Sequence, residues 1–270
     1  TRGYDVYGLI VRIPSNYNPY TRVYTGAWNG TFKLGWTNNP AWIYYDLVLD
    51  KRYGIGEFID ESNIDKWGLY TIAKYCDELV SDGRGGQEPR YTCNMVINAR
   101  DDAYKVLSTV ASIFKGMSYW AAGEMHIVAD MPKDSVMQFT AANVVDGVFN
   151  YSGSSLKTRH TVAQVTWNDP KDQYKQKVEY VEDIDSIIKW GIVQTDIIAA
   201  GCTSQAQAHR VGRWLLYTEQ LETETITFKT GIENLYMVPG DVIQTSDPNS
   251  VGARYGGRIV SIENSIIKLD

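Results

Sequence analysis

Apolar and polar side chains alternate along the start of the chain in the pattern of β-strands. Residues 4–13 alternate and contain enough β-branched side chains to predict a strand, which Pro14 should end. Asn29 and Gly30 form the dipeptide that two-residue hairpin turns prefer, so a hairpin is expected around them. The chain before position 39 is therefore predicted to be β-structure.

A helix is predicted directly after these strands. The side chain of Asn39 is suited to cap its first turn, and Pro40 suits the first helical position because its missing N–H would have no helical partner there. Gly54 and Gly56, within the sequence YGIG, are expected to stop the helix.

This predicted helix carries aromatic and acidic side chains together. Such crowding is compatible with a substrate site, but a packed face and a polar face explain it as well. We expect Trp42, Tyr45 and Leu49 to pack the helix onto the β-structure, while Asp46 and Asp50 face water or a neighbouring protein.

Apolar residues from about Ile64 onward follow the i, i+3, i+4, i+7 spacing of an amphipathic helix. Its predicted stripe consists of Leu69, Ile72, Ala73, Cys76, Leu79 and Val80. The glycine-rich stretch 81–89 is predicted to be a flexible loop and the most favourable place for a domain boundary.

A strand, helix, strand, strand unit is predicted next. It consists of a strand at 90–98, a helix that begins at Asp101 or Asp102 and ends at Gly116, and a hairpin around Gly123. The apolar stripe of this helix is formed by Ala103, Val106, Leu107, Val110, Ala111 and Phe114.

A second unit of similar order is predicted later in the chain. It has a strand at 191–200, a helix that Ser204 and Gln207 open as a capping box and that runs through Leu216, and a strand at 224–230. Further strands are predicted at 147–153, 160–169, 235–245 and 256–270, with a type II turn at Pro239 and Gly240. The fold class is therefore α+β and β-dominated.

Composition and charge narrow the function classes. Hydrophobic residues at 44% and charged residues at 21% are typical of a folded globular chain. A net charge of −6 argues against binding to nucleic-acid phosphates. The 19 Tyr and 8 Trp against 6 Phe suit cores and subunit interfaces, with a carbohydrate-stacking platform as the alternative.

The ends of the chain and its apolar runs bear on its context. The chain begins with Thr1 and closes within a strand-like pattern, so we expect a segment of a longer protein. No apolar run approaches the ~18 residues of a membrane-spanning helix, and no stretch resembles a signal peptide.

Residues that carry catalytic chemistry are few and scattered. His126 and His160 lack a Ser, Cys or carboxylate at a recognised spacing, His209 also stands alone, and no histidine pair offers metal ligands. The segment 151–156 is not a Gly-x-Ser-x-Gly elbow, and 81–89 lacks the Lys-Ser/Thr of a phosphate loop. We expect ordinary surface or half-buried histidines.

Cysteines and clustered acids also favour structural roles. The cysteines have no CxxC spacing and are expected to be buried thiols, at Cys76, Cys93 and Cys202. Asp60, Glu61 and Asp65 could form paired carboxylates for glycoside hydrolysis or supply oxygen ligands for calcium. A structural role explains them as well, because negative charge is favoured at the start of a helix. We therefore predict no catalytic residue, no cofactor and no metal.

Long motifs in this sequence resemble one family in order along nearly the whole chain. They are NNPAWIYYDLVLDKRYGIG, IDKWGLYTIAKYCDELV, GGQEPRYTCN, DDAYKVLSTVASIFKG, VADMPKD, RHTVAQVTWNDP, GCTSQAQAHRVGRWLLYTEQLETE and MVPGDVI. Together they are similar to the tail tip attachment proteins, also called host specificity proteins J, of lambda-like siphophages.

The resemblance implies a structural protein of the virion rather than an enzyme. In this family it would be made in the bacterial cytoplasm and lie at the distal tail tip as a homotrimer that closes the tail tube beside other tail-tip and tail-tube proteins. The host outer-membrane receptor would be bound by regions outside this segment, and DNA would pass without specific binding. Free phage and prophage origins both stay open.

The resemblance also implies kinship with baseplate hub proteins, whose barrel-like tube domains carry inserted strand-helix-strand units. We accordingly expect tube-domain strands at 1–38, a helical connecting segment at 39–88, hub domains at 89–145 and 146–235, and strands returning to a barrel at 236–270. We also expect acidic residues to line the lumen of the ring.

Eight residues are predicted to hold this architecture together: Pro40, Trp42, Gly54, Trp67, Trp120, Trp214, Pro239 and Gly240. Two other functions stay as alternatives. One is a tail-associated module that degrades cell wall or polysaccharide, which needs a carboxylate pair or a metal site in one cleft. The other is a carbohydrate-binding module with exposed Trp and Tyr side chains.

Overall fold

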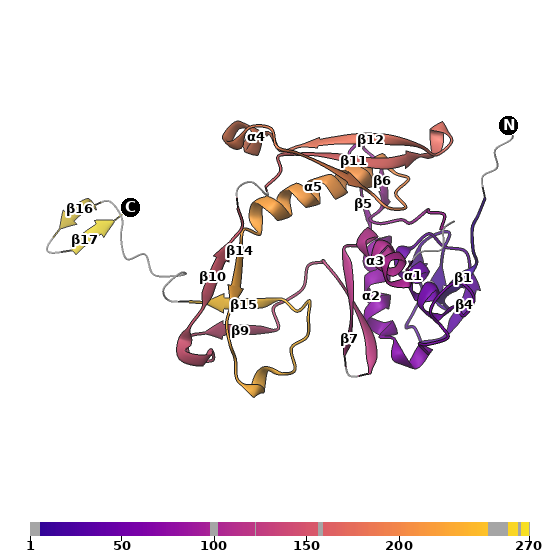
Figure 1. Cartoon of the computed structure of the whole chain (residues 1–270), viewed down its shortest axis with the longest axis horizontal. Coiled ribbons are helices and arrows are strands. Elements are labelled where there is room, and N and C mark those ends of the chain that lie inside the picture. Colours follow the sequence, from indigo (N-terminus) through magenta and orange to yellow (C-terminus); the bar gives the residue numbers. More distant parts are fainter. Residues whose placement is uncertain are drawn as a thin grey trace. The chain divides into compact units, whose positions relative to one another are not determined.

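The structure, a computed structural model, describes residues 6–97, 102–121, 123–155, 159–247, 259–263 and 266–269. These residues form two units (Figure 1). The first unit combines the chain up to Met131 with Ser155–Thr223, and the second combines Pro132–Ser154 with the chain from Glu224 onward. Helices and strands occur along the chain, which confirms the α+β class.

The predicted first strand is shorter than its sequence pattern. Strand β1 (Val11–Pro14) pairs antiparallel with β4 (Phe32–Gly35), while residues 6–10 are exposed and belong to no strand. Positions 4 and 5 lie outside the described residues. The expectation over 6–10 was wrong because a strand needs a partner for its backbone groups, and β4 reaches only as far as Val11.

The Asn-Gly turn forms, but not as the predicted hairpin. Gly30 has a left-handed φ of 81°, and the Asn29 side chain accepts a hydrogen bond from the Thr31 N–H. Residues 25–28, directly before this turn, belong to no strand, and the buried Trp28 donates from its ring to the Thr31 carbonyl at 2.7 Å. The small hairpin of this region is instead β2 (Tyr17–Asn18) with β3 (Val23–Tyr24).

Helix α1 (Pro40–Leu49) begins as predicted. The Asn39 side chain accepts from the Ala41 N–H at 3.0 Å, and Pro40 occupies the first helical position. The helix ends at Leu49 rather than at the glycines, because the backbone leaves helical geometry at Asp50. Its nearly all-round burial explains why no polar face develops: Pro40, Ala41, Trp42, Tyr44, Tyr45, Asp46, Leu47 and Val48 are buried.

Helix α2 (Lys66–Asp77) is capped by Asp65, whose carboxylate accepts from the backbone of Trp67 and Gly68. Two residues predicted for its stripe, Leu79 and Val80, belong instead to β5 (Leu79–Ser81), which pairs with β6 (Gln87–Pro89). The expected flexible loop at 81–89 is therefore a tight hairpin. The Asp82 carboxylate holds its turn by accepting from the N–H groups of Arg84 and Gly86.

The strand predicted at 90–98 is absent over 90–97, and position 98 lies outside the described residues. Its backbone bonds to loops and side chains instead of a ladder: the N–H of Cys93 donates to Asn38, and that of Asn94 to Gly201. The helix and hairpin that follow were predicted correctly. They are α3 (Ala103–Ile113), capped by the Asp102 side chain, then β7 (Gly116–Ala121) paired with β8 (Glu124–Ala129).

A three-stranded sheet completes the first unit, in the order β12 (Lys175–Glu182), β11 (Val162–Asp169), β13 (Gln194–Ile198). Helix α5 (Gln205–Leu221) packs on β11 and β12, and α4 (Ile184–Trp190) follows β12 (Figure 1). Burial alternates along β11, as expected for a strand with one covered face. The sequence pattern indicated neither β12 nor α4.

Helix α5 is longer than predicted, and its capping box is only half formed. Ser204 accepts from the Gln207 N–H at 3.3 Å. The Gln207 side chain bonds instead to the backbone of Thr92, accepting from its N–H and donating to its carbonyl. Gln207 therefore ties α5 to the extended segment before α3 and does not close its own helix.

The first unit holds two apolar clusters. The larger one joins α1, α2 and α3 with β1 and β8, and aromatic rings of α1 lie at its centre. The smaller one lies between α5 and the sheet and contains Ala163, Val165, Trp167, Val181, Cys202, Ala208 and Leu216. Gly212 of α5 allows close packing there, since an added Cβ would lie 2.7 Å from Val181.

The second unit is built from two-stranded pairs. Strand β9 (Met137–Thr140) runs parallel to β15 (Ile243–Ser246), β10 (Asn150–Gly153) antiparallel to β14 (Glu224–Thr227), and β16 (Ile259–Glu263) antiparallel to β17 (Ile266–Leu269). Strands were thus predicted correctly near 150, 225, 243 and 260, whereas residues 235–242 of the strand predicted at 235–245 belong to no strand. Among the described residues no closed barrel is formed.

Short 3-10 helices connect these elements: η1 (Glu61–Asn63), η2 (Val145–Gly147), η4 (Pro170–Asp172) and η5 (Ile232–Asn234). The part of the chain that the structure describes contains no helix with the length and apolarity needed to cross a membrane.

Candidate functional site

Trp42, predicted to hold the architecture together, lies in the middle of an aromatic cluster. Its side chain is fully buried, and its ring N–H donates to the Tyr24 hydroxyl at 3.1 Å. The rings of Trp28, Phe32 and Tyr45 have centroids 6.1–6.3 Å from its own. The aromatic crowding of α1 is therefore part of the core and forms no open cleft.

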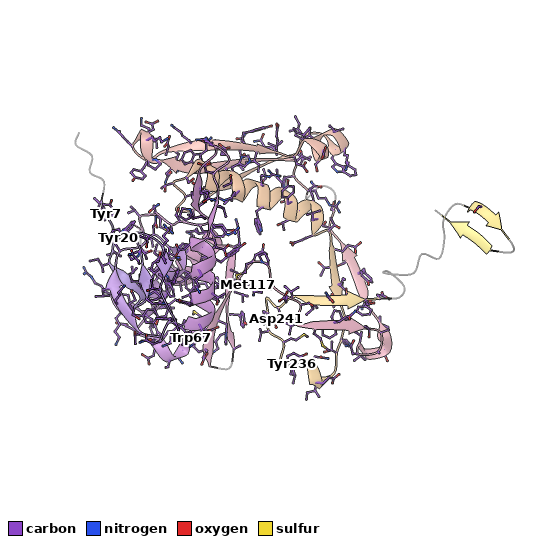
Figure 2. The ribbon with its side chains drawn as sticks, turned by 180° about the vertical axis from the view of Figure 1, so that it is seen from behind. Tyr7, Tyr20, Trp67, Met117, Tyr236 and Asp241 are labelled. Atoms are coloured by element: carbon purple, nitrogen blue, oxygen red, sulfur yellow. The ribbon has the colours of Figure 1, made fainter. Side chains whose placement is uncertain are left out.

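Two of the other predicted tryptophans lie largely at the surface. Trp67 of α2 is 52% exposed although its ring contacts Trp28 at 4.8 Å between centroids, and Trp120 of β7 is 56% exposed. Trp67 projects from the ribbon in Figure 2. Both indoles therefore leave much of their area open to solvent, while the Trp67 ring also packs against Trp28.

Trp214 of α5 links that helix to the β7–β8 hairpin. Its ring N–H donates to the Asp130 carboxylate at 2.7 Å, and the Lys115 ammonium lies 4.2 Å from the ring centroid. Burial lowers the pKa of Lys115 to about 8, and the nearby Asp130 charge opposes this shift only in part. Lys115 at this junction therefore loses its proton at a lower pH than an ordinary exposed lysine does.

The predicted glycine and proline turns are tightly built. A Cβ on Gly54 would lie 1.8 Å from the Leu47 carbonyl oxygen, so only glycine fits there. At Pro239 and Gly240, Gly240 has a φ of 90° and the Asp241 N–H donates to Val238 at 3.2 Å. The geometry is that of the predicted type II turn.

The prediction that Asp46 faces water or a neighbouring protein was wrong. Asp46 is only 2% exposed, pairs with the Arg12 guanidinium at 2.7 Å and accepts a hydrogen bond from the Tyr53 hydroxyl. Because α1 is buried on almost all sides, a carboxylate at this position needs a cation. Asp50 is partly exposed, and its carboxylate accepts from the backbone of Arg52 and Tyr53.

The histidines are half-buried or exposed, but each has a carboxylate beside it. His160 lies 2.9 Å from Glu219 and His209 lies 3.1 Å from Glu179, while His126 is 3.7 Å from Asp65. Sequence spacing missed these pairs because the partners are remote along the chain. Within the described ranges, no group of three His, Cys, Asp or Glu residues could hold a metal ion.

The cysteines are buried free thiols, as predicted. Burial raises the pKa of Cys202 to about 11 and that of Cys93 to about 12, and it also raises the pKa of Cys76. Each thiol therefore stays protonated at neutral pH and is a poor nucleophile.

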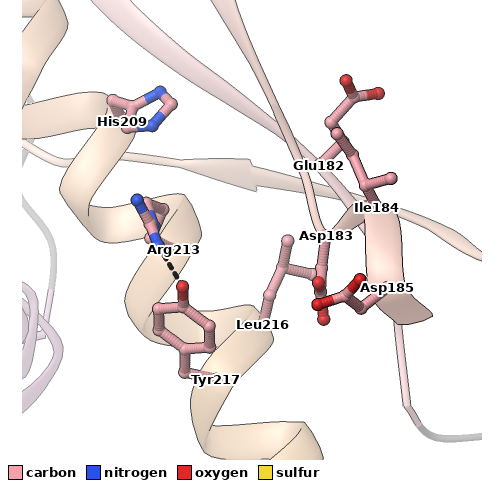
Figure 3. A pocket seen from close by; sticks show the side chains of 8 residues that line it. All are labelled: Glu182, Asp183, Ile184, Asp185, His209, Arg213, Leu216 and Tyr217. Atoms are coloured by element: carbon pink, nitrogen blue, oxygen red, sulfur yellow. Dashed lines mark hydrogen bonds between the residues drawn. The ribbon is translucent and has the colours of Figure 1, made fainter. Parts of the chain in front are cut away.

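A hollow of about 410 Å³ lies between α4 and α5 (Figure 3). Its carboxylates come from the end of β12 and the start of α4, and Arg213 and His209 line the α5 side. We call it the acidic hollow; its lining is Glu182, Asp183, Ile184, Asp185, His209, Arg213, Leu216 and Tyr217.

The acidic hollow suits recognition of a charged side chain. The Arg213 guanidinium bonds to the Tyr217 hydroxyl and lies 5.0 Å from the centroid of its ring, and His209 bonds to Glu179. Among the described residues, no ion pair joins a cation to the carboxylates of Glu182, Asp183 or Asp185. These groups can accept hydrogen bonds from a basic partner. No sequence pattern indicated the hollow, because its two walls come from separate segments of the chain, 182–185 and 209–217.

Known proteins similar to this chain come from phage tails. Tip attachment protein J of Escherichia phage SECphi27 is 42% identical over 256 residues, which cover 94% of this chain and 21% of that protein. Tip attachment protein J of Escherichia phage SECphi4 is 39% identical over 257 residues, 94% of this chain and 22% of that protein.

The chain thus spans about a fifth of the length of the curated relatives it matches. Their names support a structural role at a phage tail tip and a place in the virion, and they bear out the resemblance seen in the motifs. The profile of a family described as putative phage tail protein also matches residues 102–262. Since this region is more than half of the chain, the protein belongs to that phage tail protein family.

Proposed function

We propose that this chain is the hub segment of a tail tip attachment protein. In this role it forms a homotrimer that closes the tail tube, contacts other tail-tip and tail-tube proteins, and carries a receptor-binding region that lies elsewhere in the longer protein. The observation that carries the proposal is the similarity to two tip attachment proteins over 94% of the chain. The segment serves as a scaffold rather than as an enzyme.

Exposed large side chains support a scaffold that is completed by partners. Tyr20 is 84% exposed, Met117 50% and Tyr236 57%, and all three project from the ribbon in Figure 2. Isolated exposed apolar residues are ordinary, but many on one chain favour contact surfaces. Tyr and other aromatic residues are also enriched at the centres of protein interfaces.

The proposed hub segment also contributes strands to barrel-like tube domains. Open two-stranded pairs such as β1–β4 and β16–β17 would be completed into barrel-like tube domains by strands of the longer protein or of its neighbours. The predicted divisions at 38, 88, 145 and 235 would then separate tube-like from hub-like segments. Limited proteolysis of the assembled protein, with the cut sites mapped, tests these boundaries.

In the proposed trimer, acidic residues line the lumen of the ring. A net charge of −6 gives DNA phosphates no attraction to the chain, so DNA would leave through the ring without being held. Binding of duplex DNA to the assembled protein at low salt tests this role. We expect no measurable binding, and tight salt-sensitive binding would reject an acidic lumen.

Antibody labelling of virions tests the tail-tip function itself. An antibody raised against this chain should bind at the distal end of the tail in electron micrographs. Labelling along the tube or on the head would contradict the proposal. Incubation of the chain with peptidoglycan and with a glycan array addresses the two other functions, and turnover or saturable binding there would count against a pure scaffold.

A further inference from the structure

The first unit consists of two bodies, each with its own apolar core. The larger apolar cluster lies within residues 11–129 and the smaller one within residues 163–216, and the two clusters share no residue. We call residues 11–130 the helical body and residues 161–221 the sheet body. The chain between them at 132–154 belongs to the second unit, so no short linker joins the two bodies directly. Their attachment to each other therefore depends on noncovalent contacts.

Polar bonds run along the contact between the two bodies. Gln207, Arg210 and Trp214 of α5 have the spacing i, i+3, i+7 and lie on one face of the helix. Gln207 exchanges two hydrogen bonds with the backbone of Thr92, and the Trp214 ring donates to Asp130 at 2.7 Å. We call the contacts of these three α5 side chains with the helical body the polar seam.

Arg210 lies in the middle of the polar seam. Its guanidinium is 2.8 Å from the Glu88 carboxylate and donates to the Arg90 carbonyl at 3.0 Å. The Arg210 side chain is 25% exposed and the Glu88 side chain 22%, so the pair is largely removed from water. Such a pair fixes the orientation of two surfaces, but the cost of desolvating both charges offsets much of their attraction.

Some polar atoms at the seam are buried without a partner. Among the described residues, no hydrogen bond reaches Nε or Nη1 of Arg210 or Nε of Arg90. Such N–H groups cost free energy in the closed contact and would bond to water if the contact opened. Near the start of α5, Cys93 and Ile113 pack beside Gly201 and add apolar contact. The contact thus resembles a polar interface between domains, for which relative movement is the usual expectation.

We propose that the sheet body separates from the helical body by opening the polar seam as a whole, while both apolar cores stay intact. The closed seam is the main state, and the open state is a minor one in which Gln207, Arg210 and the segment 90–94 contact water. The first unit thereby contains a joint. This inference does not depend on the homotrimer of the proposed function.

Native-state hydrogen exchange of the full 270-residue chain, followed by nuclear magnetic resonance, tests the opening. Two contact reporters are the Asn94 amide, which donates to the Gly201 carbonyl at 2.8 Å, and the Trp214 ring N–H. The amides of Val48 and Val165 report on the two cores. After correction for intrinsic rates, both contact reporters in the wild type should show one common opening free energy and exchange at least about tenfold faster than the core reporters.

Arg210→Met and Arg213→Met form a matched pair of variants. Both remove a guanidinium from α5, but Arg213 is exposed and bonds to Tyr217 of its own helix. Arg210→Met leaves the Glu88 carboxylate without its cation, so both contact reporters should exchange about tenfold faster, by the same factor, with unchanged core reporters. The control Arg213→Met should change every reporter by less than about threefold.

A common factor at both contact reporters distinguishes joint opening from local fluctuation. Within the described part of the chain, neither reporter forms a hydrogen bond with Arg210. In Arg210→Met, acceleration at one contact reporter alone, or at none, overturns the proposal. Equal acceleration of contact and core reporters also overturns it, because the first unit then opens only by unfolding.

The wild-type exchange keeps the proposal testable if circular dichroism shows that Arg210→Met does not fold. Contact and core reporters with one shared opening free energy in the wild type would overturn the joint, since no state with an open seam and intact cores would then exist. A lower free energy shared by the two contact reporters supports it.

Discussion

Single residues show how burial decides the role of a polar or aromatic side chain. Trp42 and Asp46 lie four positions apart on α1, and both are buried, one against aromatic rings and the other against Arg12. Sequence pattern identified the packing role of Trp42. It placed Asp46 in water because a carboxylate is most often exposed, and nothing local in the sequence indicates that Arg12, 34 residues earlier, neutralises it.

Truncation of Trp42 should remove a large part of the stability of the first unit. Trp42→Ala leaves a cavity in the aromatic cluster, and buried aromatic truncations cost about 3–5 kcal/mol. Thermal melts followed by near-ultraviolet circular dichroism measure the loss. Trp120→Ala is the control, because its half-exposed ring should cost far less; equal melting temperatures for the two variants would refute the packing role of Trp42.

Lys115 gives the first unit a specific pH dependence. Its pKa falls from 10.5 to about 8 on folding, so between these values the unfolded chain binds more protons than the folded one. Stability from this group therefore rises as pH increases from about 8 to about 10. Denaturant unfolding of wild type and Lys115→Met checks the sign: the wild type should gain stability relative to the variant across this window, and a constant difference would contradict the burial of Lys115.

Whole elements were predictable where their signals were local. The caps of α1, α2, α3 and α5 and the Pro239-Gly240 turn each depend on residues within a few positions of one another. Strand β12 was missed because only Val181 of its eight residues is buried, and α4 because Ile184 and Ile188 are largely exposed. The acidic hollow could not be predicted from the sequence, because two of the three elements that line it, β12 and α4, were not predicted.

The turn that ends α1 should not tolerate a methyl group. Gly54→Ala places a Cβ 1.8 Å from a carbonyl oxygen, which forces the backbone to move and should cost on the order of 1–3 kcal/mol. Gly8→Ala is the matched control, because nothing lies within 4 Å of its added Cβ. Denaturant midpoints of the two variants test this, and an unaffected Gly54→Ala protein would show that the turn is looser than described.

At the scale of the molecule, the chain leaves the first unit after Met131, returns at Ser155 and leaves again after Thr223. Composition could predict a folded chain rich in interface-forming aromatics, but no local pattern predicts this interleaving. The five-segment division stays a prediction. The exposed apolar side chains are compatible with the contacts that we propose for a tail-tip scaffold.

Cryo-electron microscopy of the intact virion will show whether this chain forms a ring at the tail tip. We expect three copies of this chain around the tail axis at the distal end, each contacting its neighbours through protein surfaces. A single copy, a position away from the tip, or a closed cleft with a bound small molecule in place of subunit contacts would overturn the proposed hub role.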